Sequence, residues 1–150
     1  NLLRAAVEED VGRVIYLSSL EMMTSYDPDY EVAEDWRPVC PSVSTGLAEY
    51  LGECVCREFA RDGGLQVVVL RLGRVVPSEQ IGGAPGDPLW ADPRDVAQAV
   101  ELALARLASG PAPLGRWSVF HIQSGGRQGR FSVAKAKSVL GFKPQFPKPE

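Results

Sequence analysis

The stretch Leu65-Gln-Val-Val-Val-Leu-Arg-Leu72 has five apolar residues in its last six positions and follows a glycine pair, Gly63-Gly64. A continuous apolar run of this length is typical of a strand that is covered on both faces of a parallel sheet. Arg13-Val-Ile-Tyr-Leu-Ser-Ser19 and Trp117-Ser-Val-Phe-His-Ile-Gln123 have the same character. The sequence therefore predicts three short buried strands.

Two long helices are predicted between these strands, over 45–62 and 93–108. In the first, apolar residues recur at every fourth position and form the predicted buried face: Leu47, Leu51, Val55 and Phe59. Charged residues form a neighbouring stripe: Glu49, Glu53, Arg57 and Arg61. In the second, Asp92 is a good N-cap and Pro93 a good first residue. Its predicted buried face consists of Val96, Val100, Leu104 and Leu107.

Shorter helices are predicted over 1–10 and 132–140, with Gly141 closing the latter, and the Gly- and Pro-rich stretch 77–88 is predicted to be a loop. Strands that alternate with helices indicate a parallel sheet with helices on both faces. The predicted fold class is therefore α/β, with a Rossmann-like sheet.

Composition excludes several classes of function. The 150 residues carry a net charge of −3 with no basic run, so no nucleic-acid partner is expected. No apolar stretch has the length of a membrane span, and no signal peptide opens the chain. Cys40, Cys54 and Cys56 form no CxxC pair and there is a single histidine, so no metal site is predicted. A reduced, cytoplasmic setting fits this cysteine usage.

Several short motifs, read in order, resemble those of one enzyme family. They are Asn1-Leu-Leu-Arg-Ala-Ala, Arg13-Val-Ile-Tyr-Leu-Ser-Ser19, Val32-Ala-Glu-Asp35 with Pro38, Glu53 with Cys56-Arg-Glu-Phe-Ala60, Val69-Leu-Arg-Leu-Gly73, Asp95-Val-Ala97 and 130–144. Their order and spacing are similar to the extended short-chain dehydrogenase/reductase family, the NAD(P)-dependent epimerases and dehydratases of nucleotide sugars. The resemblance covers nearly the whole chain.

The resemblance implies the back half of a Rossmann-like sheet with a small C-terminal remnant of a substrate domain. Within one domain, 1–76 and 89–124 form the expected core, whereas 77–88 and 125–150 form the substrate-side segments. The family's N-terminal glycine-rich cofactor unit is expected to be absent from this chain. The run Ser124–Gly129 lacks the first glycine of G-x-G-x-x-G, which favours a surface loop over a phosphate-binding turn.

The family's catalytic residues are a serine or threonine at a strand end and a tyrosine with a lysine four residues later on one helix face. The lysine lowers the tyrosine pKa, so that the phenol exchanges protons near neutral pH. The resemblance places the serine at Ser19, the tyrosine at Thr45 and the lysine at Glu49. No Tyr-x-x-x-Lys occurs in the chain. Threonine is far less acidic, and a carboxylate disfavours loss of a proton from its neighbour.

The predicted cofactor-binding residues follow from sheet geometry, because parallel sheets bind ligands beyond the carboxyl ends of their strands. They are Ser18, Gly73, Arg74, Val75 and Val76. The family usually reads Val-Tyr-Gly-Pro where this chain has Val75-Val76-Pro77. A structural ion pair is expected for Arg71, which lies inside an apolar strand. A core or semi-exposed position is expected for His121, and a core position for Trp90 and Trp117.

Three hypotheses remain open on the sequence alone. The leading one is an epimerase/dehydratase-like protein with degenerate catalysis that retains a scaffold for a nucleotide or nucleotide sugar. The second is an active NAD(P)-dependent enzyme that uses non-standard groups, with Ser19 and Glu49 as candidates. The third is a structural or regulatory subunit without a cofactor. By resemblance, NAD or NADP is the expected cofactor, and a homodimer through the 45–62 helix is expected.

Overall fold

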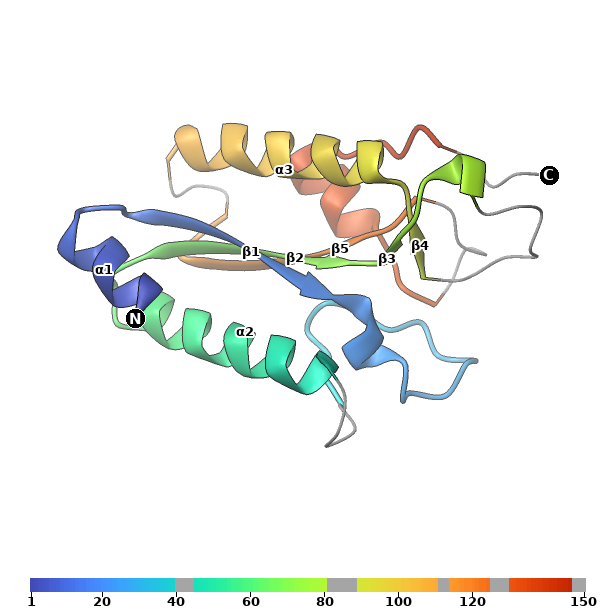
Figure 1. Ribbon diagram of the computed structural model, residues 1–150, viewed down its shortest axis with the longest axis horizontal. Coiled ribbons are helices and arrows are strands. Elements are labelled where there is room, and N and C mark those ends of the chain that lie inside the picture. The colour runs from blue at the N-terminus through green and yellow to red at the C-terminus, as the bar shows by residue number, and fades with distance from the viewer. Residues whose placement is uncertain (40–44, 81–88, 111–113, 125–129, 147–150) are drawn as a thin grey trace.

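The computed structural model describes residues 1–39, 45–80, 89–110, 114–124 and 130–146. Three parallel strands form the central sheet in the order β1-β2-β5: β1 (Arg13–Ser19), β2 (Gln66–Leu72) and β5 (Trp117–Ile122). Helix α3 (Pro93–Ala108) covers one face, and α1 (Leu2–Glu8) with α2 (Thr45–Arg61) covers the other (Figure 1). The α/β fold with a parallel sheet and helices on both faces is therefore confirmed.

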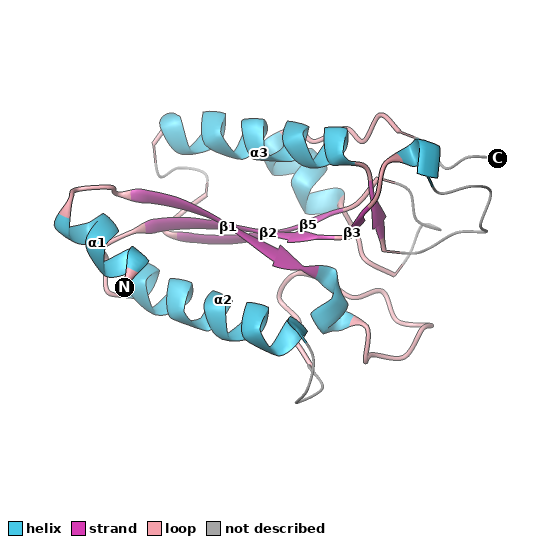
Figure 2. Cartoon of the chain, viewed as in Figure 1, coloured by secondary structure: helices cyan, strands magenta, loops and turns pink. Residues whose placement is uncertain are grey.

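Each face of the sheet has its own apolar core, because alternate strand residues point to opposite faces. Val68, Leu70, Phe120 and Ile122 face α3, where they meet a row of small and apolar side chains: Ala99, Ala103 and Leu107. Val67, Val69 and Val119 face α2, where they meet Cys56 and Ala60. Strands β2 and β5 are thus largely buried between two helical layers (Figure 2). The burial predicted for the first strand is wrong, because in β1, at the edge of the sheet, only Ser18 is buried and Leu17 is 51% exposed.

The buried face predicted for α2 is wrong in its details. The residues that α2 buries are Gly46, Glu53, Cys56 and Ala60. Leu51 is 56% exposed and Val55 is 51% exposed. A strict four-residue repeat advances by about 40° at each step around a helix of 3.6 residues per turn, so the predicted stripe turns away from the sheet. The small residues permit a close approach of α2, and Glu53 is buried because it has a partner on β2.

The face predicted for α3 is correct at Leu107, and Val100 packs against the core, but the most buried positions before Leu107 lie one residue earlier than predicted. Asp95, Ala99, Ala103 and Leu107 are buried, whereas Leu104 is 55% exposed. Asp95 tolerates burial because its carboxylate accepts hydrogen bonds from the backbone N–H groups of Gln145 (2.8 Å) and Phe146 (3.4 Å). The C-terminal segment therefore packs against the first turns of α3.

Short elements complete the fold. Turn η1 (Leu20–Met23) follows β1, and a second small parallel sheet joins β3 (Arg74–Val75) to β4 (Trp90–Ala91), with turn η2 (Ser78–Gln80) between them. The small sheet was not predicted. The helix expected over 132–140 contains a π-helical turn, η3 (Ala136–Leu140), which ends at Gly141 with a φ of 82°. No helix in the described part of the chain has the length and apolarity required to cross a membrane.

Candidate functional site

The carboxyl end of β1 and the first turn of α2 lie side by side. The Ser19 hydroxyl accepts a hydrogen bond from the Glu21 backbone N–H (3.1 Å) and so caps η1. A Cβ built on Gly46 of α2 would lie 3.6 Å from the Met22 backbone in that turn. The three predicted catalytic positions therefore come from adjacent elements. Within the described ranges, no hydrogen bond or ion pair links Ser19 to Thr45 or Glu49.

Acidic groups surround Glu49. Burial raises the pKa of its half-buried carboxyl, and the neighbouring carboxylates of Glu21 and Glu53 raise it further. The Tyr16 phenol donates a hydrogen bond to the Glu49 backbone carbonyl (3.3 Å). Burial raises the pKa of Tyr16, and Cys56, Glu49 and Glu53 act in the same direction. The Tyr16 phenol is therefore not activated for proton transfer, because its surroundings disfavour loss of its proton.

The predicted cofactor-binding residues lie at the carboxyl ends of β1 and β2. Ser18 is buried, and its hydroxyl has no hydrogen-bond partner among the described residues. A Cβ on Gly73 would overlap the Leu89 backbone carbonyl oxygen, so only glycine fits there. Arg74 and Val75 form β3, and Arg74 also contacts the Glu21 carboxylate (3.8 Å).

Val76 continues this segment with backbone contacts on both sides. Its N–H donates to the Ala91 carbonyl (3.0 Å), and its carbonyl accepts from the Trp90 indole N–H (2.7 Å). Trp90 is buried, as predicted. The Gly73–Val76 segment is therefore held in place by β4 and passes η1 at the strand ends.

Asp92 anchors the loops beside this segment. Its fully buried carboxylate accepts hydrogen bonds from the backbone N–H groups of Arg94 (2.9 Å) and Ser78 (2.9 Å) and from the Arg94 guanidinium (2.8 Å). These contacts, the Arg94 guanidinium first among them, hold the pKa of Asp92 well below its usual range. The predicted N-cap of α3 is confirmed, and the same side chain fixes the turn η2.

A polar row crosses the sheet one residue before the strand ends. Strand register aligns Ser18 of β1 with Arg71 of β2, and Arg71 with His121 of β5. Arg71 forms a buried bidentate ion pair with Glu53 of α2, with Nε–Oε1 at 2.9 Å and Nη2–Oε2 at 2.8 Å. The structural ion pair expected for Arg71 is thus confirmed. His121 is fully buried, as predicted, and neither ring nitrogen has a partner among the described residues.

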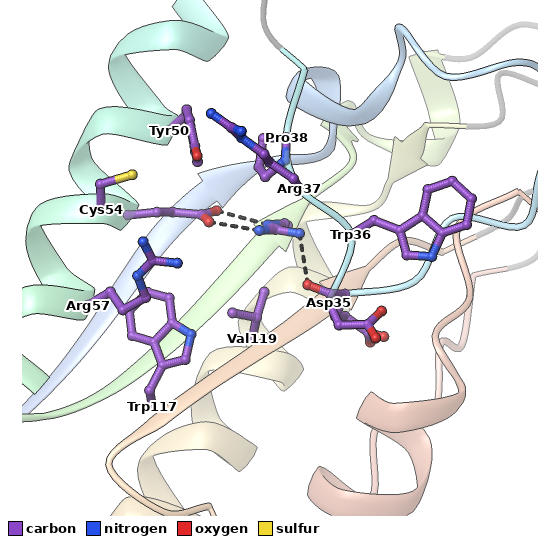
Figure 3. A pocket seen from close by; sticks show the side chains of 12 residues that line it. Asp35, Trp36, Arg37, Pro38, Tyr50, Cys54, Arg57, Trp117 and Val119 are labelled. Carbon is purple, nitrogen blue, oxygen red and sulfur yellow. Dashed lines mark hydrogen bonds and ion pairs between the residues drawn. The ribbon is translucent and has the colours of Figure 1, made fainter. Parts of the chain in front are cut away.

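A pocket of about 440 Å³ lies on the flank of α2 (Figure 3), and Ser19 is not among the residues that line it. The loop 34–38, one face of α2 and the side chains of Arg71, Trp117 and Val119 line it. Trp117 is only partly buried, so the core position predicted for it is correct only in part. This pocket was not predictable from the sequence, because loop 34–38 and Trp117 are far apart in the chain.

No family model matches the sequence, and no curated protein is significantly similar to it. Solved structures match over 97% of the chain. Glucuronic acid dehydrogenase from Chromohalobacter salexigens matches with a TM-score of 0.77 at 20% identity over 51% of its own chain. Uronate dehydrogenase from Agrobacterium tumefaciens, a Y136A mutant complexed with NAD, matches with a TM-score of 0.75 at 20% identity over 51% of its chain.

A third match is MoeE5 in complex with UDP-glucose and NAD, with a TM-score of 0.70 at 22% identity over 64% of its chain. At these identities the likeness shows the fold. The chain spans about half the length of the dehydrogenases that it matches. The protein therefore has the parallel α/β fold found in about half of a uronate dehydrogenase chain, in agreement with the fold that its resemblance to epimerases and dehydratases predicts.

Proposed function

We propose that this chain belongs to an NAD(P)-dependent epimerase/dehydratase-like protein whose proton-transfer site is degenerate and whose strand ends still bind a nucleotide or nucleotide sugar. The observation that carries the proposal is the acidic surrounding of Glu49, at the position where the family has a lysine. Burial and, after it, the carboxylates of Glu21 and Glu53 raise the pKa of this carboxyl. A carboxyl group at position 49 cannot stabilise a phenolate at position 45, as the family's lysine does. This chain also has threonine at position 45, where the family has the tyrosine.

Binding is supported by the strand ends themselves. The buried Ser18 hydroxyl has unused hydrogen-bonding capacity within the described residues, and Gly73 allows the backbone of β4 to approach closely. Two of the solved structures with this fold were determined with NAD, one of them also with UDP-glucose. Ser18 and the Gly73–Val76 segment are the residues that we propose beside the cofactor. A bound cofactor would supply hydride-transfer chemistry, whereas Glu49 does not fit the ribose-binding role of a lysine.

Turnover and binding must be measured separately. We expect the purified protein to form no NAD(P)H and no epimer with UDP-glucose or uronates, yet to melt at a higher temperature with NAD(P) or UDP-glucose. Turnover that Thr45→Ala abolishes and Ser109→Ala retains would overturn the degenerate site. Ser109, at the far end of α3, is the matched hydroxyl control. A melting temperature that no ligand raises would instead favour a structural subunit.

We also propose that α2 contributes to a homodimer. Leu51 and Val55 are apolar, about half exposed and one turn apart on its outer side. We expect Val55→Arg to shift the protein toward the monomer in analytical ultracentrifugation. Leu104→Arg, at a comparably exposed leucine on α3, is the control and should leave the mass unchanged. Equal effects of the two substitutions would contradict an interface on α2.

A further inference from the structure

Two charged residues that line the pocket beside α2, Arg71 and Glu53, neutralise each other. Arg71 uses Nε and Nη2 for the carboxylate of Glu53, and its Nη1 donates to the Glu34 backbone carbonyl at 3.2 Å. Both members of the ion pair are 4% exposed. The buried pair therefore neutralises itself, and any charge recognition must come from the side chains at the opening.

Two guanidinium groups at the opening are available. Arg57 extends from α2, and the side chain of Arg37 points from the loop 34–38 toward Tyr50 of α2 (Figure 3). The carboxylate nearest to Arg57 is that of Glu58, 4.0 Å away, and Glu58 also forms a close ion pair with Arg61. Arg37 has no ion pair within the described residues. Guanidinium groups bind carboxylates through charge-assisted, bidentate hydrogen bonds.

The loop also contributes two acidic side chains to the pocket, Glu34 and Asp35. The Glu34 carboxylate accepts a hydrogen bond from the His121 backbone N–H (3.4 Å). Asp35 projects from the loop below Trp36, away from Arg37 and Arg57 (Figure 3). The side of the pocket nearest α2 is therefore the cationic one.

Aromatic surface adjoins these cations. Trp117 projects from β5 beside α2 and, together with Arg57, also lines a second hollow that continues along the helix. Its indole is partly buried against the α2-side core. An indole next to guanidinium groups suits a flat ring that carries an anionic group. The volume of about 440 Å³ exceeds the need of an inorganic ion and falls within the usual range for small-molecule sites.

We propose that this pocket binds a small aromatic carboxylate, with its carboxylate held by Arg57 and Arg37 and its ring against Trp117. The site is separate from the strand ends, because Ser19, Thr45 and the Gly73–Val76 segment do not line it. It therefore takes a second ligand, independent of the nucleotide or sugar proposed above.

The test uses 4-fluorobenzoate as the probe and fluorine NMR titration of the whole chain as the readout. We expect millimolar binding or tighter, at least about 10-fold weaker binding of the neutral 4-fluorobenzamide, and a similar loss for Arg57→Gln. Arg57→Lys keeps the charge but not the bidentate geometry and should restore part of the affinity. Arg106→Gln, on α3 across the sheet, is the charge-matched control and should bind as the wild type does.

Several results would overturn the proposal. They are equal affinities for the acid and the amide, an Arg57→Gln variant that binds 4-fluorobenzoate as the wild type does, and an Arg106→Gln variant that loses as much affinity as Arg57→Gln. A titration that shows no saturable binding of 4-fluorobenzoate would also overturn the proposal. Arg37→Gln provides a second variant at an exposed position, so that the result does not depend on one substitution. A thermal melt of each variant shows that it is folded.

Discussion

Replacing His121 with leucine should make the stability of this protein less sensitive to acid. Burial, followed by the positive charges of Arg71 and Lys135, lowers the pKa of the imidazole from 6.5 to about 3. In the unfolded chain the ring binds a proton near its ordinary pKa, whereas in the folded protein it stays neutral. The unfolded state therefore binds more protons between these two values, and the free energy of unfolding falls as the pH falls.

The size of the effect follows from the two pKa values. Above about pH 6.5 the imidazole is neutral in both states, so its titration takes nothing from the stability of the folded state. Between pH 7.5 and pH 5.0, protonation of the imidazole in the unfolded chain lowers the free energy of unfolding by about 2 kcal/mol. His121→Leu removes the titration and leaves the backbone N–H, which donates to Glu34. At neutral pH it should cost little, because the imidazole nitrogens have no partner within the described residues.

The assay is urea unfolding of both proteins, followed by tryptophan fluorescence, at several pH values between these limits. Carboxylates titrate alike in the two proteins, so the difference between their free energies of unfolding isolates the histidine. We expect the wild type to lose about 2 kcal/mol relative to the variant as the pH falls. Two curves that remain parallel over this range would refute the inference that the folded protein keeps His121 neutral.

Two further substitutions test the packing at the strand ends. Arg71→Met should lower the free energy of unfolding by about 3–5 kcal/mol, because it leaves the Glu53 carboxylate buried and unpaired. Adding Glu53→Leu should recover most of that loss, as measured by urea titration. A double variant that is as unstable as the single one would argue against this. Gly73→Ala should lower the melting temperature because its Cβ would overlap the Leu89 carbonyl oxygen, whereas Gly12→Ala, with no atom within 4 Å, should leave it unchanged.

Strand and helix positions were predictable from the sequence because they depend on local patterns. The apolar runs that end at Leu17 and Leu72 mark strands, although only the second strand is buried along nearly its whole length, and Gly141 marks a helix end through its positive φ. The helix faces were less predictable. Hydrophobicity favoured Leu51 and Leu104 as core residues, but close packing of small side chains on the sheet decided the rotation of α2 and α3.

At the strand ends, the positions of the candidate site residues were predictable from the sequence, but their surroundings were not. It placed Ser19 and Glu49 on adjoining elements, yet the carboxylates around Glu49 and its contact with Tyr16 depend on tertiary packing. The expectation that a buried arginine needs a partner was sound, but the identity of that partner was missed. Glu53 was assigned only to a charged stripe of the helix, because only the fold brings it to Arg71.

The ion pair between Glu53 and Arg71 also has a consequence for both ends of α2. A bidentate contact at the middle of the helix fixes how far α2 is turned about its own axis. Glu49 lies one turn before this point and Arg57 one turn after it, toward the strand ends and the flank pocket respectively. A substitution at position 53 that rotates the helix would therefore displace both side chains together, and neither site can be redesigned through that residue alone.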